Sequence, residues 1–373
     1  MAVIGFGDLR NRSLPALWDA AYFKRLELRD GTSFEAMVQE TARALTGFNG
    51  EILSMPHYSG LFAVQNSPAL KYAIGTSNTW EEATEYGIPD PRRGKTSGHM
   101  LPIKPYDWAL GWTQWYLREH YAEDLRADVQ SMVDSLRKLW QQKLLTRFFS
   151  DVANTVDDTA LADLPFVNST NDISTYVPPI SPQGEEFANT HDHIIGYGTA
   201  GVTATTFDIG AINVCVEHLQ EHGYDQPFEM VISRTDVTSW GAITDFKPVN
   251  WNGIAYHASA VERANFTDIN SYIGAVETKY GMLNVWETPR LPTYHAGFYK
   301  RMDDGAEGGA GAPLRVRYDD MYRFGFGLVP GDYVNSPTHL VLGFGKFGVG
   351  VGNRTNGVVL DLNSSTYSAP TIT

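Results

Sequence analysis

Apolar residues recur at steps of three and four over residues 121–150, the spacing that places them on one face of a helix. Acidic residues lie near the start of this segment and basic residues near its end, as the helix dipole favours. The pattern predicts one long helix of about 45 Å, longer than most helices of globular proteins. Its apolar stripe consists of Leu125, Val129, Met132, Val133, Leu136, Trp140, Leu144 and Phe148.

Two shorter helices and several strands are also predicted. Thr32 and Glu35 have the T-x-x-E spacing of a capping box, so we expect a helix to begin there and to end at Gly47 and Gly50. A second amphipathic helix is predicted over 208–222. Runs typical of strands occur at 230–233, 272–276, 282–286, 314–330 and 338–351.

Residues 51–111 have a different character. Six prolines interrupt helices there, while 61–64 and 71–74 have the composition of short strands. The stretch 87–98 (GIPDPRRGKTSG) has the turn chemistry of a mobile tip. We predict one long two-stranded projection, which has little core of its own and needs a neighbour to pack on. Irregular or loop-rich segments are expected at 1–31, 151–206 and 303–313.

Composition narrows the class of protein. The chain has 373 residues and is 43% hydrophobic, enough to bury a large core, so a wholly disordered chain is excluded. Its one cysteine, Cys215, excludes an intramolecular disulfide framework and any zinc site built from several cysteines. The first ten residues do not have the pattern of a signal peptide, and no run of about 18 apolar residues predicts a membrane-spanning helix.

The formal charge of −14 is unevenly distributed. Residues 1–150 carry 17 basic and 17 acidic side chains, whereas 151–373 carry 12 and 26. Between Arg147 and Arg234 there are 13 acidic residues and no Lys or Arg. We interpret this segment as a solvated acidic face, with a surface for hard cations such as calcium as the alternative. The net acidity argues against a general nucleic-acid binder.

Two histidine motifs could carry metal chemistry. His218-Leu219-Gln220-Glu221-His222 satisfies H-x-x-E-H, in which two histidines on one helical face bind zinc and the glutamate acts as a base. Because Gly223 follows directly, we expect the helix to fray there, and we interpret the histidines as favourable partners of the helix dipole. The alternative is a zinc hydrolase that uses His218 and His222 with a distant acid.

His191-Asp192-His193 forms a second possible metal-binding group. In an extended strand the two histidines would share a face and both could ligate. No third ligand is assigned, so we interpret the pair as ordinary surface residues.

A glycine-rich stretch, Gly343-Phe344-Gly345-Lys346-Phe347-Gly348, matches the dinucleotide fingerprint G-x-G-x-x-G. That fingerprint needs a helix to follow, whereas the next residues (VGVGN) forbid one, so we predict a glycine-rich strand. Cys215 lies in an apolar helical run and is expected to be a buried, inert thiol. We predict no catalytic residues, no cofactor and no metal.

The order of the predicted parts resembles a major capsid protein of tailed double-stranded DNA phages, of the Hong Kong 97 type. Three stretches carry the resemblance. The first, 101–149, runs from a projection strand through a short turn into the long helix. The second, 207–233, is a helix followed by a proline and the strand MVIS. The third, 272–292 (YIGAVETKYGMLNVWETPRLP), is a strand and turn that lead to a Leu-Pro pair.

The resemblance implies an α+β Hong Kong 97-type capsid fold with an N-terminal arm, an extended β-hairpin loop, a long spine helix, and peripheral and axial domains. It assigns 1–50 to the arm, 51–111 to the extended loop, 112–222 to the peripheral domain with spine helix 121–150, 223–311 to the axial domain, 312–355 to the returning strands of the peripheral domain, and 356–373 to a C-terminal tail.

The function implied is structural rather than enzymatic. Copies of the chain would form pentamers and hexamers of an icosahedral shell around DNA that is enclosed without sequence-specific binding, with no membrane involved. The subunit would be assembled in the host cytoplasm and reside in the virion. Further partners implied are a separate scaffolding protein, a portal and a decoration protein. An encapsulin-like nanocompartment shell is the alternative with the same fold.

Two local features are weighed against the family. Basic residues of the predicted loop, which are Arg92, Arg93 and Lys95, are expected to contact acidic residues of a neighbouring subunit. Some members of the family cross-link a loop lysine to an asparagine. The local sequence identifies no such pair among Lys71, Lys95, Lys104, Asn335, Asn353 and Asn356, so we do not transfer that chemistry.

Overall fold

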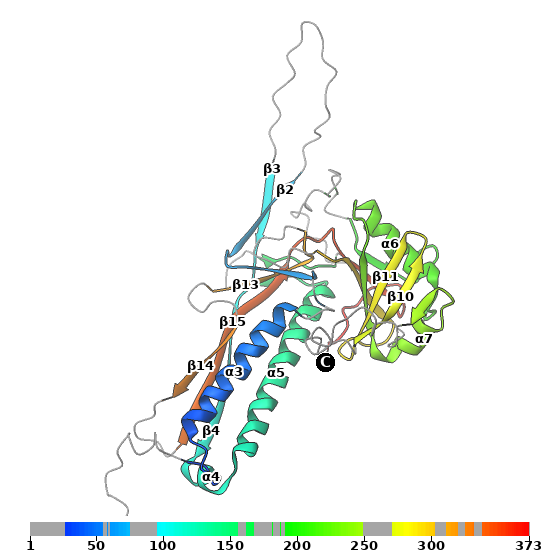
Figure 1. Cartoon of the computed structure of the whole chain (residues 1–373). Helices are drawn as coiled ribbons and strands as arrows, with labels where there is room; N and C mark the ends of the chain where they lie inside the picture. Colours follow the sequence, from blue (N-terminus) through cyan, green and yellow to red (C-terminus); the bar gives the residue numbers. More distant parts are fainter. Residues whose placement is uncertain are drawn as a thin grey trace, which may run out of the picture. The chain divides into compact units, whose positions relative to one another are not determined.

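The structure is a computed structural model, and it describes residues 27–54, 58, 60–74, 95–155, 162–167, 181, 187, 191–248, 271–302, 311–319, 325–331 and 338–372. It combines long helices with several sheets, so the α+β class is confirmed (Figure 1). The chain divides into two compact units. The first contains the described parts of 1–48, 107–135 and 326–344, and the second contains the described remainder.

The elements are bounded as follows. The helices are α3 (Phe34–Ser54), α4 (Gln114–Glu119), α5 (Ala122–Phe148), α6 (Ile209–Glu221), the 3-10 turn η2 (Arg234–Asp236) and α7 (Val237–Gly241). The strands are β1 (Phe62–Gln65), β2 (Ala69–Ile74), β3 (Lys95–Met100), β4 (Lys104–Thr113), β5 (Asn154–Thr155), β6 (Ala162–Asp163), β7 (Ile194–Gly196), β8 (Phe228–Ser233), β9 (Phe246–Pro248), β10 (Tyr272–Thr278), β11 (Gly281–Thr288), β12 (His295–Lys300), β13 (Leu314–Tyr318), β14 (Phe326–Gly331), β15 (Thr338–Val351) and β16 (Val358–Asp361).

The predicted long helix is α5, which runs from Ala122 to Phe148. Its stripe residues Leu125, Met132, Trp140 and Leu144 are buried, and acidic residues stand in its first turn. No helix in the described part of the chain combines the length and the apolar character needed to cross a membrane.

Helix α3 begins and ends differently from the prediction. Ser33 rather than Thr32 accepts a hydrogen bond from the first turn, through its Oγ and the Ala36 amide. The helix also continues past Gly47 and Gly50 to Ser54. A glycine inside a helix costs only about 1 kcal/mol relative to alanine. Burial of the apolar side chains Phe48 and Ile52 in the continuing turns outweighs that cost.

In the first unit, Trp112 anchors the start of α5. Its Nε1 donates to Asp128 Oδ2 at 2.9 Å, and Phe34 packs edge-on against its ring. Glu40 on α3 forms a bidentate pair with Arg126 on α5. The pair is half-exposed, so it orients the two helices more than it stabilises them.

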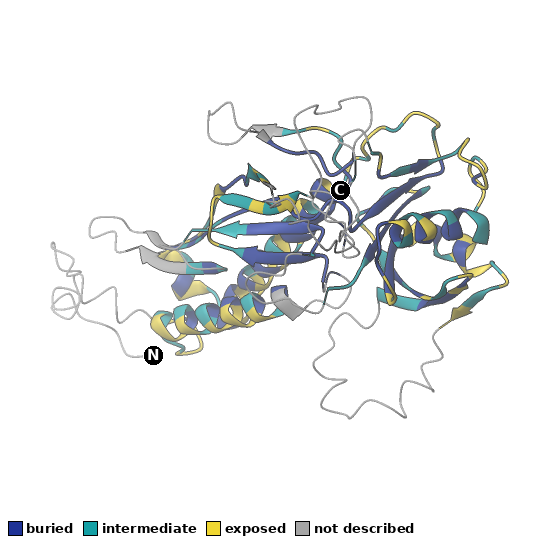
Figure 2. Cartoon of the chain, turned by 90° about the horizontal axis from the view of Figure 1, so that it is seen from above, coloured by how far each residue is buried: buried dark blue, intermediate teal, exposed yellow. Residues whose placement is uncertain are grey.

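In the second unit, α6 covers a seven-stranded sheet of order β7-β16-β12-β8-β11-β10-β9. The helix forms as predicted, because its apolar stripe packs on the sheet and Gly223, at φ 80°, stops it. Cys215 is buried in this core. Figure 2 shows the strands as largely buried and the helices as exposed on one side. The strands predicted at 230–233, 272–276 and 282–286 are β8, β10 and β11.

The segment 51–111 is only partly a two-stranded projection. β2 and β3 form an antiparallel pair whose register runs from Ala69 opposite Met100 to Ile74 opposite Lys95. Residues 95–98 therefore belong to a strand rather than to a turn, and 87–94 lie outside the described residues. β1 pairs with β13, and β4 pairs with β15. Three consecutive side chains of β1 are buried, whereas in β4 alternate side chains, those of Leu110 and Trp112, are buried.

The G-x-G-x-x-G stretch lies in the middle of β15 and no helix follows it, as predicted. Two glycines of β15, Gly348 in this stretch and Gly350 just after it, have a packing role. A Cβ at Gly348 would overlap the carbonyl oxygen of Pro102, and one at Gly350 would meet the side chain of Leu101. The strand can therefore approach the 101–103 main chain only where it has no side chain.

Candidate functional site

The last turn of α6 places two histidines side by side. Asp208 caps the start of the helix by accepting from the Ala211 amide at 2.9 Å. His218 and His222 are four residues apart, so they share the face at its end. His222 is the C-cap residue, and its side chain is completely buried. The helix end is therefore held in place rather than frayed, in contrast to our expectation.

Two more histidines come from the segment that leads into β7. Asp192 Oδ1 accepts from the Ile194 amide at 3.1 Å, which fixes the turn before the strand. His193 is completely buried and His191 is half-buried. The interpretation of this pair as ordinary surface residues was wrong for His193, because α6 and residues 353–357 enclose it.

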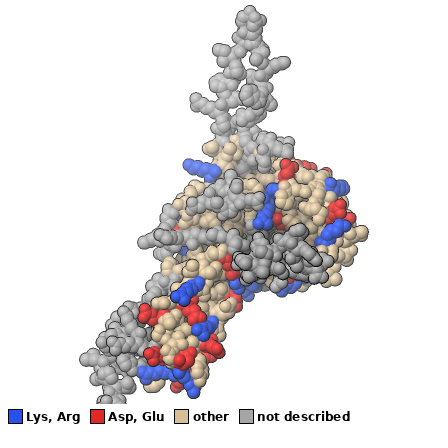
Figure 3. Space-filling model, in the orientation of Figure 1, with Lys and Arg blue, Asp and Glu red and all other residues tan. Residues whose placement is uncertain are grey.

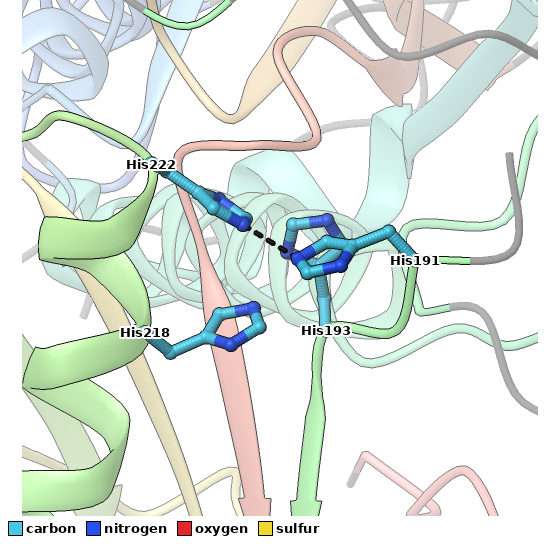
Figure 4. Close-up of side chains that lie close together, drawn as sticks. All are labelled: His191, His193, His218 and His222. Carbon is cyan, nitrogen blue, oxygen red and sulfur yellow. Dashed lines mark hydrogen bonds between the residues drawn. The ribbon is translucent and has the colours of Figure 1, made fainter. Parts of the chain in front are cut away.

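The four imidazoles form one cluster, in which the ligand-capable atoms all lie within 4.8 Å of one another. Figure 4 shows the rings turned toward a shared centre. The ring of His191 stacks on that of His218 with centroids 5.0 Å apart. His191 Nε2 and His222 Nε2 lie 2.7 Å apart.

A buried polar loop, residues 352–357, fixes two of the rings. His222 Nδ1 donates to the Thr355 carbonyl at 2.7 Å, and His193 Nδ1 donates to the Gly357 carbonyl at 3.0 Å. A neutral imidazole carries one N–H, so both rings leave Nε2 as a bare lone pair. His191 Nε2 then donates to His222 Nε2.

Burial keeps these imidazoles neutral. It lowers the pKa of His218 to about 3 and that of His222 to about 4, with the neighbouring histidines adding to the effect. The pKa of His193 is well below its usual value, first because of burial and then because of the charge of Arg354. Burial likewise lowers the pKa of His191.

Two ring nitrogens of the cluster are left without a partner. Within the described part of the chain, Nε2 of His193 and Nε2 of His218 are buried and make no hydrogen bond. Such an atom costs about 1–3 kcal/mol if nothing binds it. The H-x-x-E-H glutamate does not join them: Glu221 is exposed, and among the described residues no carboxylate belongs to the cluster.

The 352–357 loop is held by hydrogen bonds of Asn353 and Asn356, which the sequence suggested only as residues to weigh for a cross-link. Asn356 accepts from the Lys300 amide and donates to the carbonyls of Lys300 and Gly311. Asn353 donates to the hydroxyl of Tyr224 at 2.8 Å. Both asparagines are buried in these bonds.

A buried ion pair links α5 to β6. Arg147 Nη2 lies 2.9 Å from Asp163 Oδ2, with both side chains almost wholly buried. Asp163 Oδ1 also accepts from the Val351 amide, and His99 Nε2 donates to the Val351 carbonyl. Burial raises the pKa of Asp163 to about 6 despite the opposing charge of Arg147.

The structure does not describe the side chains of the loop that are predicted to contact a neighbouring subunit. Arg92 and Arg93 lie outside the described residues, as does the side chain of Lys95. On the face drawn in Figure 3, the described surface shows acidic and basic side chains interspersed. Among the described side chains, the four histidines are the group best arranged to bind a ligand.

Comparison with known proteins identifies a solved structure that shares this fold. No family model matches the sequence, and no curated protein matches it. A solved structure from Mycobacterium phage Patience matches with a TM-score of 0.57 and 18% identity, over 92% of this chain and 93% of that chain. The two chains share one fold. The fold expected from the resemblance is therefore shared with a protein of a phage.

Other solved structures align at lower similarity. One is the asymmetric unit of the bacteriophage PhiM1 mature capsid, with a TM-score of 0.46 and 12% identity over 81% of this chain and 85% of that chain. Another is the capsid structure of the cyanophage P-SCSP1u, with a TM-score of 0.46 and 11% identity over 81% and 86%.

Proposed function

We propose that this chain is a major capsid protein that assembles into pentamers and hexamers of an icosahedral shell. The observation that carries the proposal is the fold shared with a solved structure from Mycobacterium phage Patience, which spans 92% of this chain rather than one part of it. The role is structural rather than enzymatic. The encapsulin-like alternative has no observation of its own in its favour.

The domain assignment follows from the same proposal. Residues 1–50 act as the arm and 51–111 as the extended loop. Residues 112–222 and 312–355 build the peripheral domain, and 223–311 build the axial domain, with 356–373 as the tail. α5 would be the spine helix of the peripheral domain.

The surface of the described chain suits assembly. The β2–β3 pair exposes alternate residues and has no fully buried side chain in β2. Trp115 and Tyr121 expose 68% and 47% of their surface. Exposed aromatic side chains and a thin hairpin gain stability when a second subunit covers them. DNA would be enclosed without specific binding, with scaffolding, portal and decoration proteins as further partners in the virion, after assembly in the host cytoplasm.

The first test is whether the purified protein assembles into particles. We expect negative-stain electron microscopy of purified, untagged protein to show closed shells or capsomer rings, and sedimentation to show species far above 41.4 kDa. A chain that stays a compact monomer at high concentration contradicts the proposal.

A shortened hairpin provides the matched variant. Because Ile74 pairs with Lys95, residues 75–94 can be replaced by an Asn-Gly turn that keeps β2 and β3 in register. We expect this variant to keep the circular dichroism spectrum of the full chain while losing closed shells. Normal shells from it would remove the proposed role of the extended loop.

The basic residues of the loop give a second prediction. Arg92→Glu with Arg93→Glu is expected to weaken shells, because each exposed ion pair contributes only about 0–1 kcal/mol but repeats around every ring. The denaturant midpoint of shell dissociation measures the change. Lys138→Glu with Lys279→Glu alters the net charge equally and serves as the control. Unchanged shell stability in the loop variant would refute the contact.

A further inference from the structure

We propose that His191, His193, His218 and His222 bind one divalent transition-metal ion, preferably zinc, in a closed structural site that ties α6 to the edge strand β7. The proposal is independent of the shell function, since it concerns the interior of a single subunit. It rests on four convergent imidazoles and on two buried ring nitrogens that have no other use.

The geometry suits a tetrahedral ion. Zinc binds histidine nitrogen at about 2.0–2.1 Å, which puts any two of four ligands about 3.3 Å apart. The nitrogens of this cluster lie within 4.8 Å of one another, and the pair from His191 and His222 lies at 2.7 Å. Small ring rotations that lengthen the short separation and shorten the long ones bring all four onto one ion.

The rings are prepared as ligands. Metal-binding histidines commonly donate their second nitrogen to a carbonyl, which fixes the ring and leaves the other nitrogen free. His193 and His222 do this through Gly357 and Thr355.

The choice of ion follows from the donors. Four nitrogens and no carboxylate among the described residues exclude calcium and magnesium, which require oxygen ligands. The positive charge of Arg354 acts on His191 and His193 and weakens the binding of any cation. Only ions that form strong bonds to imidazole, such as zinc, nickel or copper, overcome it.

The arrangement is that of a structural site rather than a catalytic one. A catalytic zinc keeps a position open for water, whereas four protein ligands close the shell. Phe187 packs against His191 and His222 with centroids 5.1 and 4.4 Å away, which covers the cluster further. Glu221, the glutamate of the H-x-x-E-H motif, is exposed.

The ion would connect segments that are distant in the sequence. It would join the end of α6 to the residues before β7, and through the two carbonyls it would also hold the 352–357 loop. Among the strands that the structure describes, β7 is an edge strand of three residues paired only with β16. A metal cross-link at its start would therefore keep it in the sheet.

The test uses the full, untagged chain, because a histidine tag would bind the same metals. The protein is stripped with a chelator and titrated with zinc. We expect about one zinc per chain and a rise in the unfolding temperature that saturates at one equivalent. Cobalt(II) in place of zinc is expected to give the intense visible absorption of a four-coordinate site.

Variants locate the site. His218→Gln with His222→Gln is expected to weaken zinc binding by about 100-fold or more. Loss of a residue that only hydrogen-bonds to a metal ligand already costs about 10–100-fold in affinity, and loss of two ligands costs more. His120→Gln, outside the cluster, is the control and should bind normally. Binding of less than about 0.1 zinc per chain, or unchanged affinity in the double variant, overturns the proposal. If the double variant fails to fold, the cobalt spectrum of the unmodified chain decides: absorption of a six-coordinate ion overturns it.

Discussion

Replacing Asp163 by asparagine is expected to lower the free energy of unfolding by about 3–5 kcal/mol, because it leaves the charge of Arg147 buried without a counter-ion. Both side chains of this pair are almost wholly buried, and their nearest charged atoms lie 2.9 Å apart. The substitution also weakens the acceptor of the Val351 amide. Urea unfolding of dissociated subunits, followed by tryptophan fluorescence, measures the loss.

A double variant separates the charge from the packing. Arg147→Met with Asp163→Leu removes both charges and keeps apolar volume, so we expect it to recover most of the lost stability. Burial lowers the pKa of Arg147 and raises that of Asp163, so desolvation acts against both charges. If the double variant is less stable than Asp163→Asn, then the ion pair holds α5 to β6 better than apolar side chains of similar volume do.

The second large effect is expected at Gly348. Gly348→Ala should cost at least about 3 kcal/mol, the upper end of the usual cost of overpacking, because the new Cβ would overlap main chain at Pro102 and Ile103 rather than a movable side chain. Thermal unfolding of the soluble subunit gives the measurement.

Gly343 in the same strand is the matched control. A Cβ there would meet the Trp108 carbonyl oxygen at 3.7 Å and Met132 Sδ at 3.8 Å, which are ordinary contact distances. Gly343→Ala should therefore change stability by less than about 1 kcal/mol, since it also restricts the unfolded chain. Equal effects at the two glycines would contradict the close approach of β15 to residues 101–103.

Periodic segments were the part of the fold that the sequence predicted best. α5 and α6 follow from their apolar stripes, and the glycine-rich β15 follows from the residues after its motif. The end of α3 was wrong because burial of Phe48 and Ile52 overrides two glycines, and tertiary packing is not visible in a local pattern.

The histidine cluster could not be assembled from the sequence. Neither pair of histidines supplies a full set of ligands by itself, and the missing ligands of one pair are the other pair, 25 or more residues further along the chain. The loop that supports them reads GNRTNG, a composition typical of exposed turns, although the structure buries it. The useful signal was the coincidence of two paired-histidine motifs in a chain with ten histidines.

The strand order of the seven-stranded sheet determines when its β7 edge can form during synthesis. β16 lies between β7 and β12, and β7 has no other neighbour among the described strands of the sheet. A ribosome must therefore translate some 160 further residues before residues 194–196 acquire their backbone partner at 358–361. Until then the growing chain carries an incomplete sheet edge, so a partly made subunit is unable to present the finished surface on which copies meet.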